Sequence, residues 1–247
     1  MAKRIDLLLI ERGIFESRAK ARAAIEAGNV KADGKTVAKP SQKFDADVEI
    51  LAKAAHPYVS RAGLKLAHGL SVFEIDIEGR HCLDIGASTG GFTQVLLEAG
   101  ATHVDAVDVG REQLHASLVS DKRVTNLENH DARTLNRGIL TGVPDIVVCD
   151  ASFIALEKLL ERPLSLAALD AVFIGLFKPQ FQVGRKNIGR GGIVTDDEAI
   201  KTAWLNFSAW LNGIGWQIQK KADSPILGGD GNREYLFLAT RQATGVS

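Results

Sequence analysis

Short apolar runs alternate with helical patterns from about residue 61 to the end of the chain. The strand-like runs lie at 81–85, 103–107, 124–127, 145–149, 171–177, 216–220 and 234–240. Strands that alternate with helices predict a mainly parallel sheet covered by helices on both faces. The last two runs lie close together, which favours an antiparallel pair at one edge of that sheet.

A different pattern occupies the first fifty or so residues. Apolar positions at helical spacing predict a short helix within residues 5–14 and a second helix that begins after Ser17 and closes at Gly28. Asp33-Gly34, between two short basic runs, is a hairpin turn signal. We therefore expect a small α+β domain over 1–52, a linker over 53–60 and an α/β domain over 61–247, which starts with a helix near 61–73.

The charge is balanced overall but divided along the chain. Residues 1–43 hold ten basic and five acidic side chains, a net charge of +5, so the remainder carries −5. This asymmetry predicts attraction for a polyanion at the N-terminal end, although a solvated basic surface is the simpler reading. The predicted RNA-binding side chains in this region are Arg4, Arg18, Lys20, Arg22, Lys31 and Lys35.

Several classes of protein fit the sequence poorly. Cys82 and Cys149 both lie in apolar runs, which favours buried thiols in a reducing compartment over a disulfide framework. Asp6 and Glu11 interrupt the apolar N-terminal stretch, and no apolar run approaches ~20 residues, the length of a membrane-spanning helix. We expect a cytoplasmic protein with no membrane association and no metal site.

A glycine-rich turn follows the first predicted strand and opens a helix. Its spacing is wrong for a nicotinamide dinucleotide, and Asp84 would face the cradle, which suits the amino and sulfonium groups of S-adenosylmethionine better than a pyrophosphate. Asp108 ends the second strand, where it could accept both ribose hydroxyls, with mid-strand Asp105 as its competitor. A structural glycine turn is the alternative. The predicted cofactor-binding residues are Asp84, Gly86, Ala87, Ser88, Thr89, Gly90, Gly91, Phe92, Asp108 and Asp131, the last for the adenine amino group.

Two further charged residues lie at strand ends beside this crevice. Asp150 ends the fourth strand, and Lys178 ends the fifth. A lysine that ends an apolar strand is costly to bury unless it is paired or close to water, which favours a functional Lys178.

Two resemblances cover nearly the whole chain. The order of residues that includes Ser17-Arg18, Gly28-Asn29-Val30 and Asp33-Gly34 resembles the RNA-binding domain first described in ribosomal protein S-four. Runs at 58–66, 84–93, 107–110, 148–154, 178–181 and 229–235 are similar to the TlyA family, often labelled hemolysin A. That resemblance implies a Rossmann-type seven-stranded methyltransferase sheet and an FtsJ-type ribosomal RNA cytidine 2′-O-methyltransferase that acts on a ribosomal subunit.

The family's catalytic set of two lysines, an aspartate and a glutamate is implied to fall on Lys65, Asp150, Lys178 and Glu234. Departures from the family pattern occur at Ala62, at Gln94 and at residues 128–131, the last of which weakens the assignment of Asp131. Lys178 is the candidate base for the hydroxyl proton. Lys65 would favour its neutral form, and the two carboxylates would oppose it.

Alternatives stay open at this point. Arg61 and the basic, glycine-rich segment with Arg185, Lys186 and Arg190 are further predicted RNA contacts, but that segment could equally be an ordinary mobile loop. The whole protein could be a non-catalytic ribosome-assembly factor or, as the historical family label implies, a membrane-lytic protein. A pseudouridine synthase would share the N-terminal domain but not the glycine-rich turn. The sequence leaves the oligomeric state and the modified nucleotide undetermined.

Overall fold

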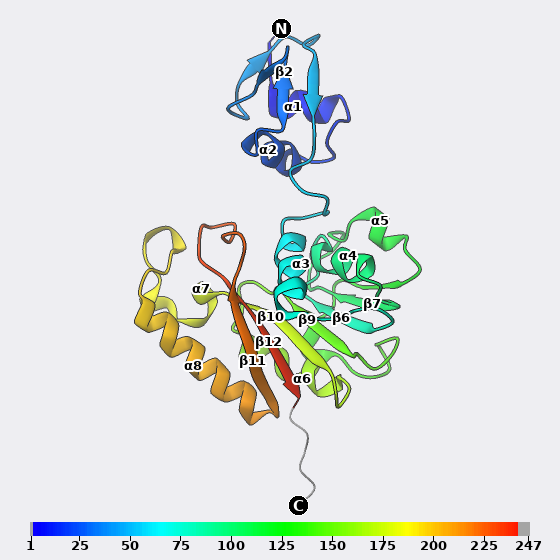
Figure 1. Ribbon diagram of the computed structural model, residues 1–247, viewed down its shortest axis with the longest axis vertical. Coiled ribbons are helices and arrows are strands. Elements are labelled where there is room, and N and C mark those ends of the chain that lie inside the picture. Colours follow the sequence, from blue (N-terminus) through cyan, green and yellow to red (C-terminus); the bar gives the residue numbers. More distant parts are fainter. Residues whose placement is uncertain (1, 242–247) are drawn as a thin grey trace, which may run out of the picture. The chain divides into compact units, whose positions relative to one another are not determined.

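The computed structural model describes residues 2–241, which form two compact units that divide between Pro57 and Tyr58 (Figure 1). The predicted linker over 53–60 spans this division. Each unit has its own apolar core, so each is described by itself.

The N-terminal unit combines two helices with two small antiparallel sheets. Its elements are β1 (Lys3–Arg4), α1 (Ile5–Glu11), α2 (Arg18–Glu26), β2 (Val30–Ala32), β3 (Lys35–Thr36), β4 (Lys43–Phe44) and β5 (Ile50–Ala52). Strand β2 pairs with β3 and β5, and β1 pairs with β4. The sequence predicted both helices and the β2–β3 hairpin, but not the very short strands β1, β4 and β5.

Local signals in this unit take the conformations that the sequence predicted. The Ser17 hydroxyl accepts a hydrogen bond from the Lys20 N–H at 3.3 Å and so caps α2. Gly28 follows the end of that helix with φ of +73°. Asp33 and Gly34 also have positive φ, +48° and +75°, as a tight hairpin turn requires.

One carboxylate is buried in the N-terminal unit. The side chain of Asp6 is fully buried and accepts hydrogen bonds from Arg4 Nε and Nη2 at 2.9 Å each and from Arg18 Nη2 at 3.0 Å. The hydrogen bond from Arg4 is the largest cause that lowers the pKa of Asp6, to about 2. Arg4 and Arg18, both predicted RNA contacts, therefore also neutralise a buried charge.

The C-terminal unit follows the alternating order that the apolar runs predicted. Its helices are α3 (Ala62–Phe73), α4 (Gly91–Glu98), α5 (Ala116–Val119), α6 (Leu156–Leu166), α7 (Pro179–Gln182) and α8 (Asp197–Gly213), with 3-10 turns η1 (Ala132–Thr134), η2 (Arg185–Asn187) and η3 (Arg190–Gly192). Its strands are β6 (His81–Ile85), β7 (His103–Val107), β8 (Val124–Leu127), β9 (Ile146–Cys149), β10 (Val172–Phe177), β11 (Trp216–Asp223) and β12 (Tyr235–Arg241).

These strands form one seven-stranded sheet in the order β11-β12-β10-β9-β6-β7-β8. Strand β12 is antiparallel to both of its neighbours, and the remaining pairs are parallel. The predicted antiparallel pair at one edge is thus confirmed as β11 and β12. The carboxyl ends of β6, β7, β8, β9 and β10 meet at one edge of the sheet, where α/β folds of this kind bind their ligands.

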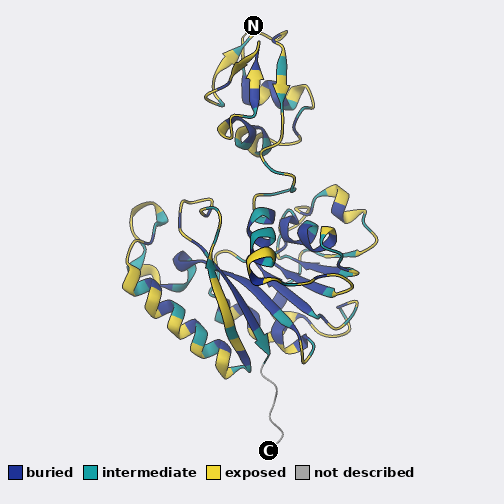
Figure 2. Cartoon of the chain, in the orientation of Figure 1, coloured by how far each residue is buried: buried dark blue, intermediate teal, exposed yellow. Residues whose placement is uncertain are grey.

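Helices cover both faces of the sheet, whose central strands are buried (Figure 2). Alternate strand residues belong to two opposite apolar cores. Leu83, Val147 and Phe173 pack with α6 and α8 on one face. Cys82 and Val148 pack with α3 and α4 on the other. Burial on both sides explains why these strands read as continuous apolar runs in the sequence. Cys82 and Cys149 are both buried and unpaired.

Candidate active site

A sharp turn between β6 and α4 forms the floor of the site. Gly86 and Gly90 have φ of +79° and +92°, and Ser88 has φ of +47°. A Cβ atom at Gly86 would lie 3.1 Å from the Cα atom of Ala151, so the backbone after β9 leaves room only for glycine. Glycine at this turn therefore lets the chain after β6 approach the chain after β9 closely.

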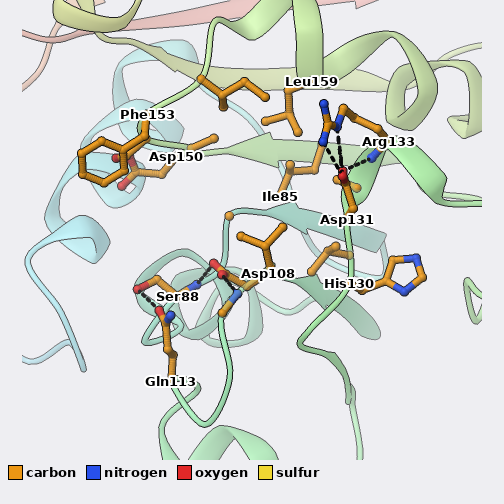
Figure 3. Close-up of a pocket in the computed structure, with 18 residues that line it drawn as sticks. Ile85, Ser88, Asp108, Gln113, His130, Asp131, Arg133, Asp150, Phe153 and Leu159 are labelled. Atoms are coloured by element: carbon orange, nitrogen blue, oxygen red, sulfur yellow. Dashed lines mark hydrogen bonds and ion pairs between the residues drawn. The ribbon is translucent and has the colours of Figure 1, made fainter.

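A cavity of about 600 Å³ opens beside this turn (Figure 3). Its walls come from the residues that follow β6, β7, β8 and β9. Gly86 and Ser88 line it, whereas Ala87 and Phe92 are 7% and 2% exposed and pack in the core beneath the turn. Thr89, Gly90 and Gly91 shape the turn and the start of α4 without lining the cavity.

Asp108 lies at the cavity wall, at the end of β7, with its carboxylate held by backbone donors. Its Oδ2 accepts from the Ser88 N–H at 2.8 Å, and its Oδ1 accepts from the Gly110 N–H at 2.7 Å (Figure 3). Each oxygen has a second lone pair, so the carboxylate can still accept two hydroxyl groups from a ligand. This geometry suits the ribose contact that the sequence predicted.

Asp84, near the end of β6, has a carboxyl group whose ionised form is disfavoured by burial. It is fully buried, its Oδ2 accepts from Thr93 Oγ1 at 2.6 Å, and its Oδ1 has no hydrogen-bond partner among residues 2–241. Burial first, and then repulsion from Asp150 and Asp108, raise the pKa of Asp84 to about 7. A cationic ligand beside Asp84 would relieve both the burial cost and the repulsion.

Asp131 also lines the cavity, but its carboxylate is bound to a neighbour. It accepts from Arg133 Nε at 2.9 Å and pairs with Arg133 Nη2 at 2.6 Å, and the hydrogen bond from Arg133 is the main cause that lowers its pKa (Figure 3). The predicted adenine contact would therefore share this carboxylate with the Arg133 guanidinium.

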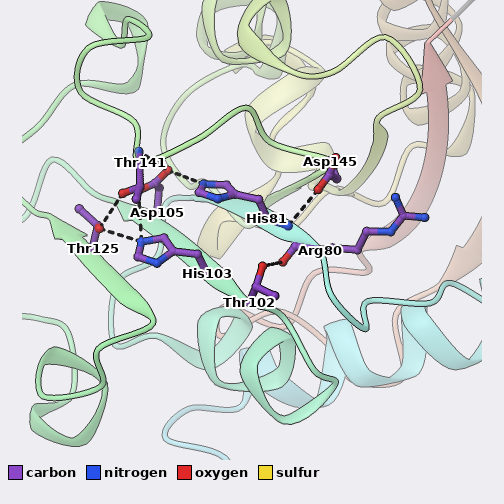
Figure 4. Close-up of polar contacts among 8 residues, drawn as sticks. All are labelled: Arg80, His81, Thr102, His103, Asp105, Thr125, Thr141 and Asp145. Atoms are coloured by element: carbon purple, nitrogen blue, oxygen red, sulfur yellow. Dashed lines mark hydrogen bonds and ion pairs between the residues drawn. The ribbon is translucent and has the colours of Figure 1, made fainter.

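Asp105, the competitor for the ribose contact, belongs to a different part of the sheet (Figure 4). It is fully buried and accepts from His81 Nε2 at 2.9 Å and from Thr141 Oγ1 at 2.8 Å. His81 and His103, whose rings stack at 5.2 Å, begin β6 and β7, so these contacts lie toward the amino ends of the strands. Burial lowers the pKa of His103. Asp105 is thus bound by residues near the amino ends of the strands, whereas Asp108 follows the carboxyl end of β7.

The four residues of the implied catalytic set form two ion pairs. Lys178 Nζ lies 2.6 Å from Asp150 Oδ1, and Lys65 Nζ pairs with Glu234 Oε2. Lys65, Lys178 and Glu234 are 7%, 6% and 4% exposed, so each pair is largely shielded from water.

Strand register brings these pairs to one edge. Phe177 of β10 pairs with Tyr235 of β12, so Lys178 and Glu234, one residue beyond each, follow at the same end of adjacent strands. Asp150 follows β9, the other neighbour of β10, and lines the cavity. Lys178 Nζ also donates to Ser152 Oγ at 2.8 Å and to the Asp150 carbonyl at 3.3 Å. Its ammonium therefore donates two hydrogen bonds, and Asp150 Oδ1 lies close enough for an ion pair but accepts no hydrogen bond from residues 2–241.

An aromatic side chain at the cavity is a feature that the sequence analysis did not single out. Phe153 lines the cavity, is 92% exposed, and has φ of +67°, which is unusual for a bulky residue. Its ring contacts Phe181 at 5.3 Å between centroids. The signal in the sequence was an aromatic residue three positions after Asp150, at the end of a strand.

The predicted RNA contacts lie largely on the surface. Lys20 pairs with Glu16 at 2.6 Å. The remaining predicted side chains outside the Asp6 cluster are exposed: Arg22, Lys31, Lys35, Arg61, Arg185, Lys186 and Arg190.

Residues 2–241 contain neither a membrane-spanning helix nor a metal-binding cluster. No helix in this range has the length and apolar character that crossing a membrane requires. The same range holds no group of three or more His, Cys, Asp or Glu side chains arranged to bind a metal ion.

Comparison with known families gives two matches that agree with the two units. Residues 58–241 match the FtsJ-like methyltransferase family, and residues 3–50 match the S4 domain. The chain is 41% identical to a 16S/23S rRNA (cytidine-2′-O)-methyltransferase TlyA from Mycobacterium tuberculosis, over 96% of this chain and 90% of that protein. It is 37% identical to a protein named Hemolysin A from Brachyspira hyodysenteriae, over 94% of this chain and 98% of that one.

A solved structure from Streptococcus thermophilus that carries a hemolysin label superposes with a TM-score of 0.78 at 37% identity. The match covers 98% of this chain and 89% of that one. The predicted seven-stranded methyltransferase sheet with a small N-terminal domain is thereby confirmed.

Proposed function

Because this chain belongs to the FtsJ-like methyltransferase family, we propose that it transfers a methyl group from S-adenosylmethionine to a ribose 2′-hydroxyl of cytidine in ribosomal RNA. The observation that carries this proposal is the pair of buried lysine–carboxylate contacts, Lys178–Asp150 and Lys65–Glu234, at the strand edge where Asp150 also lines the cavity. The target named for the Mycobacterium tuberculosis relative supports the choice of cytidine.

The residues around the cavity fit S-adenosylmethionine. A volume of about 600 Å³ lies within the range of roughly 300–1,000 Å³ that small-molecule sites take. Asp108, which lines the cavity, would accept the ribose hydroxyls. Asp84 is fully buried and does not line the cavity, but it precedes the lining residues Ile85 and Gly86, and from there it would balance the positive charge of the donor. The bound donor supplies an electrophilic methyl group on a positively charged sulfur.

Lys178 and its partners would handle the hydroxyl proton. An incoming 2′-hydroxyl can take the place of Ser152 Oγ as a partner of Lys178 Nζ, because a hydroxyl group can make the same contact. Once the lysine has lost a proton to solvent, its amine can accept the hydroxyl proton, and Asp150 then stabilises the ammonium that forms. Glu234 would hold Lys65 in place beside this centre.

Both units would contact RNA, the C-terminal unit through a base and the N-terminal unit through phosphates. The exposed ring of Phe153 at the cavity offers a surface on which an unstacked base can stack. The basic S4 unit would contact phosphates, since its side chains Arg22, Lys31 and Lys35 are exposed and carry positive charge.

Nucleoside mass spectrometry of ribosomal RNA from cells with and without the gene tests this proposal. We expect one or more 2′-O-methylcytidines to disappear with the gene and to return with the wild-type chain, but not with Lys178→Ala. Restoration of ribosome assembly without any methyl group would instead identify a non-catalytic assembly factor.

A further inference from the structure

A buried asparagine joins two loops at the edge of the proposed active site. Asn232 is 1% exposed, and its side chain uses both ends of its amide. Its Oδ1 accepts from the Val194 N–H at 2.9 Å, and its Nδ2 donates to the Gly192 carbonyl at 2.9 Å. The Asn232 side chain therefore makes two hydrogen bonds to the backbone of a segment that lies about forty residues earlier in the chain.

The first of the two segments that Asn232 joins is the basic loop, residues 184–192. It carries the exposed cations Arg185, Lys186 and Arg190. Gly191 and Gly192 have φ of +73° and +83°, with open space around a Cβ built at either position. Side-chain packing around these glycines therefore contributes little, and hydrogen bonds keep the shape of the loop. Two are internal, from the Gly192 N–H to the Gly189 carbonyl at 3.1 Å and from the Gly189 N–H to the Ile193 carbonyl at 2.8 Å, and the Asn232 side chain supplies the others.

The second segment is the glutamate loop, residues 228–234, to which Asn232 itself belongs. The Gly228 N–H donates to the Asn232 carbonyl at 2.9 Å, and the Asn232 N–H donates to Asp230 Oδ1 at 3.2 Å. This loop is tightly folded around Glu234, since a Cβ at Gly228 would lie 2.7 Å from Glu234 Oε1.

The glutamate loop is also tied to the helix that follows Lys178. Asp230 Oδ2 accepts from Gln180 Nε2 at 3.1 Å, and Gln180 is two residues beyond Lys178. The contacts of Asn232 and Asp230 therefore connect the basic loop with the segments that carry Glu234 and Lys178.

We propose that Asn232 is a positioning residue that holds the basic loop in the shape that receives RNA phosphates, in fixed register with the glutamate loop. Methyl transfer requires the hydroxyl to lie in line with the methyl group and its leaving sulfur. Phosphate contacts from the basic loop, which Asn232 ties to the loop that carries Glu234, would hold the RNA hydroxyl in that position. The identity of the ligand as RNA rests on the proposed function.

A double-mutant cycle on RNA binding tests this inference. Asn232→Ala is combined with a triple variant of the basic loop, Arg185→Ala, Lys186→Ala and Arg190→Ala, and binding to ribosomal RNA from a strain without the gene is measured across salt concentrations. We expect each change alone to weaken binding about tenfold, and the triple change to add less than about twofold once Asn232 is gone. Asn136→Ala, at an exposed position outside both loops and outside the cavity lining, is the matched control and should leave binding unchanged.

Salt dependence separates lost phosphate contacts from a general loss of structure. Three lost contacts should reduce the slope of log affinity against log salt by about 2 in Asn232→Ala, as in the triple variant. The KM for RNA should rise in the same variant while the KM for S-adenosylmethionine stays at the wild-type value.

Either of two results overturns the inference: full additivity in the cycle, or a triple variant that binds like wild type. If Asn232→Ala does not fold, Asn232→Asp keeps the side-chain size and the acceptor for Val194 but sets an oxygen against the Gly192 carbonyl. It should show the same losses, and wild-type affinity and salt slope in that variant count against the inference. A wild-type chain that binds RNA with this pattern but transfers no methyl group would refute the proposed function alone.

Discussion

Replacing Asp84 with asparagine should make the ligand-free protein more stable at neutral and alkaline pH. The pKa of this carboxyl is raised from 3.8 to about 7, mainly by burial. The folded chain therefore holds the proton more tightly than the unfolded chain, so the free energy of unfolding falls as pH rises from about 4 to about 7 and is level above that. Asparagine keeps an oxygen for the Thr93 hydroxyl and carries no charge to bury.

The size of this effect follows from the raised pKa. Each pKa unit corresponds to about 1.4 kcal/mol, and a carboxyl with a pKa of about 7 is half ionised at pH 7, so between pH 5 and pH 7 the wild type should lose about 2 kcal/mol of unfolding free energy relative to Asp84→Asn. Urea unfolding at pH 5, 6, 7 and 8 measures the difference, with the exposed acid Asp170→Asn as control. Parallel stability curves for wild type and Asp84→Asn across this range would refute the reasoning.

The same variant should bind the methyl donor more weakly, because Asp84 would no longer offer a negative charge to it. In the wild type a bound cation favours the ionised carboxylate, so affinity for S-adenosylmethionine should rise with pH up to about 7, with proton release on binding. Calorimetry in buffers of different ionisation enthalpy should detect this proton in the wild type and not in Asp84→Asn. Equal proton release in both would remove Asp84 from the donor site.

Three further changes test other parts of the account. Asp108→Asn should weaken S-adenosylhomocysteine binding at least about tenfold, since hydrogen bonds to a charged group contribute about 1.5–3 kcal/mol, and RNA affinity should stay unchanged. Phe153→Leu should lower kcat/KM for RNA about tenfold through lost base stacking, and an unchanged value would exclude that contact. Asp6→Asn should destabilise the N-terminal unit by about 2 kcal/mol, and wild-type stability, seen by thermal unfolding, should fall as pH drops from about 4 toward 2.

The sequence predicted the central strands β6 and β7 closely because both are buried on both faces, and it also predicted β8, which lies at the edge of the sheet. The runs at 81–85, 103–107 and 124–127 agree with β6, β7 and β8 to the residue. Edge strand β11 extends three residues beyond its predicted end, to Asp223, because two of those residues are charged and all three pair with β12 alone. Strands β1, β4 and β5 of the N-terminal unit escaped prediction, since tertiary pairing rather than local pattern holds them.

The candidate site was predictable where it depends on strand ends and less so where it depends on side-chain direction. Asp84, Asp108 and Asp150 could be identified as carboxylates at or near the carboxyl ends of strands. Lys65 and Glu234 lie 169 residues apart, and only the family resemblance brought them together. Local pattern did not indicate that Arg133 would bind the carboxylate of Asp131.

The most direct test of the account is the product formed on ribosomal subunits from a strain without the gene. Incubation with wild-type protein and S-adenosylmethionine, followed by nucleoside mass spectrometry, should yield 2′-O-methylcytidine, and Lys178→Ala should yield none while it binds S-adenosylhomocysteine normally. A methyl group found on a base, or full formation of 2′-O-methylcytidine by Lys178→Ala, would contradict the proposed role of the Lys178–Asp150 pair.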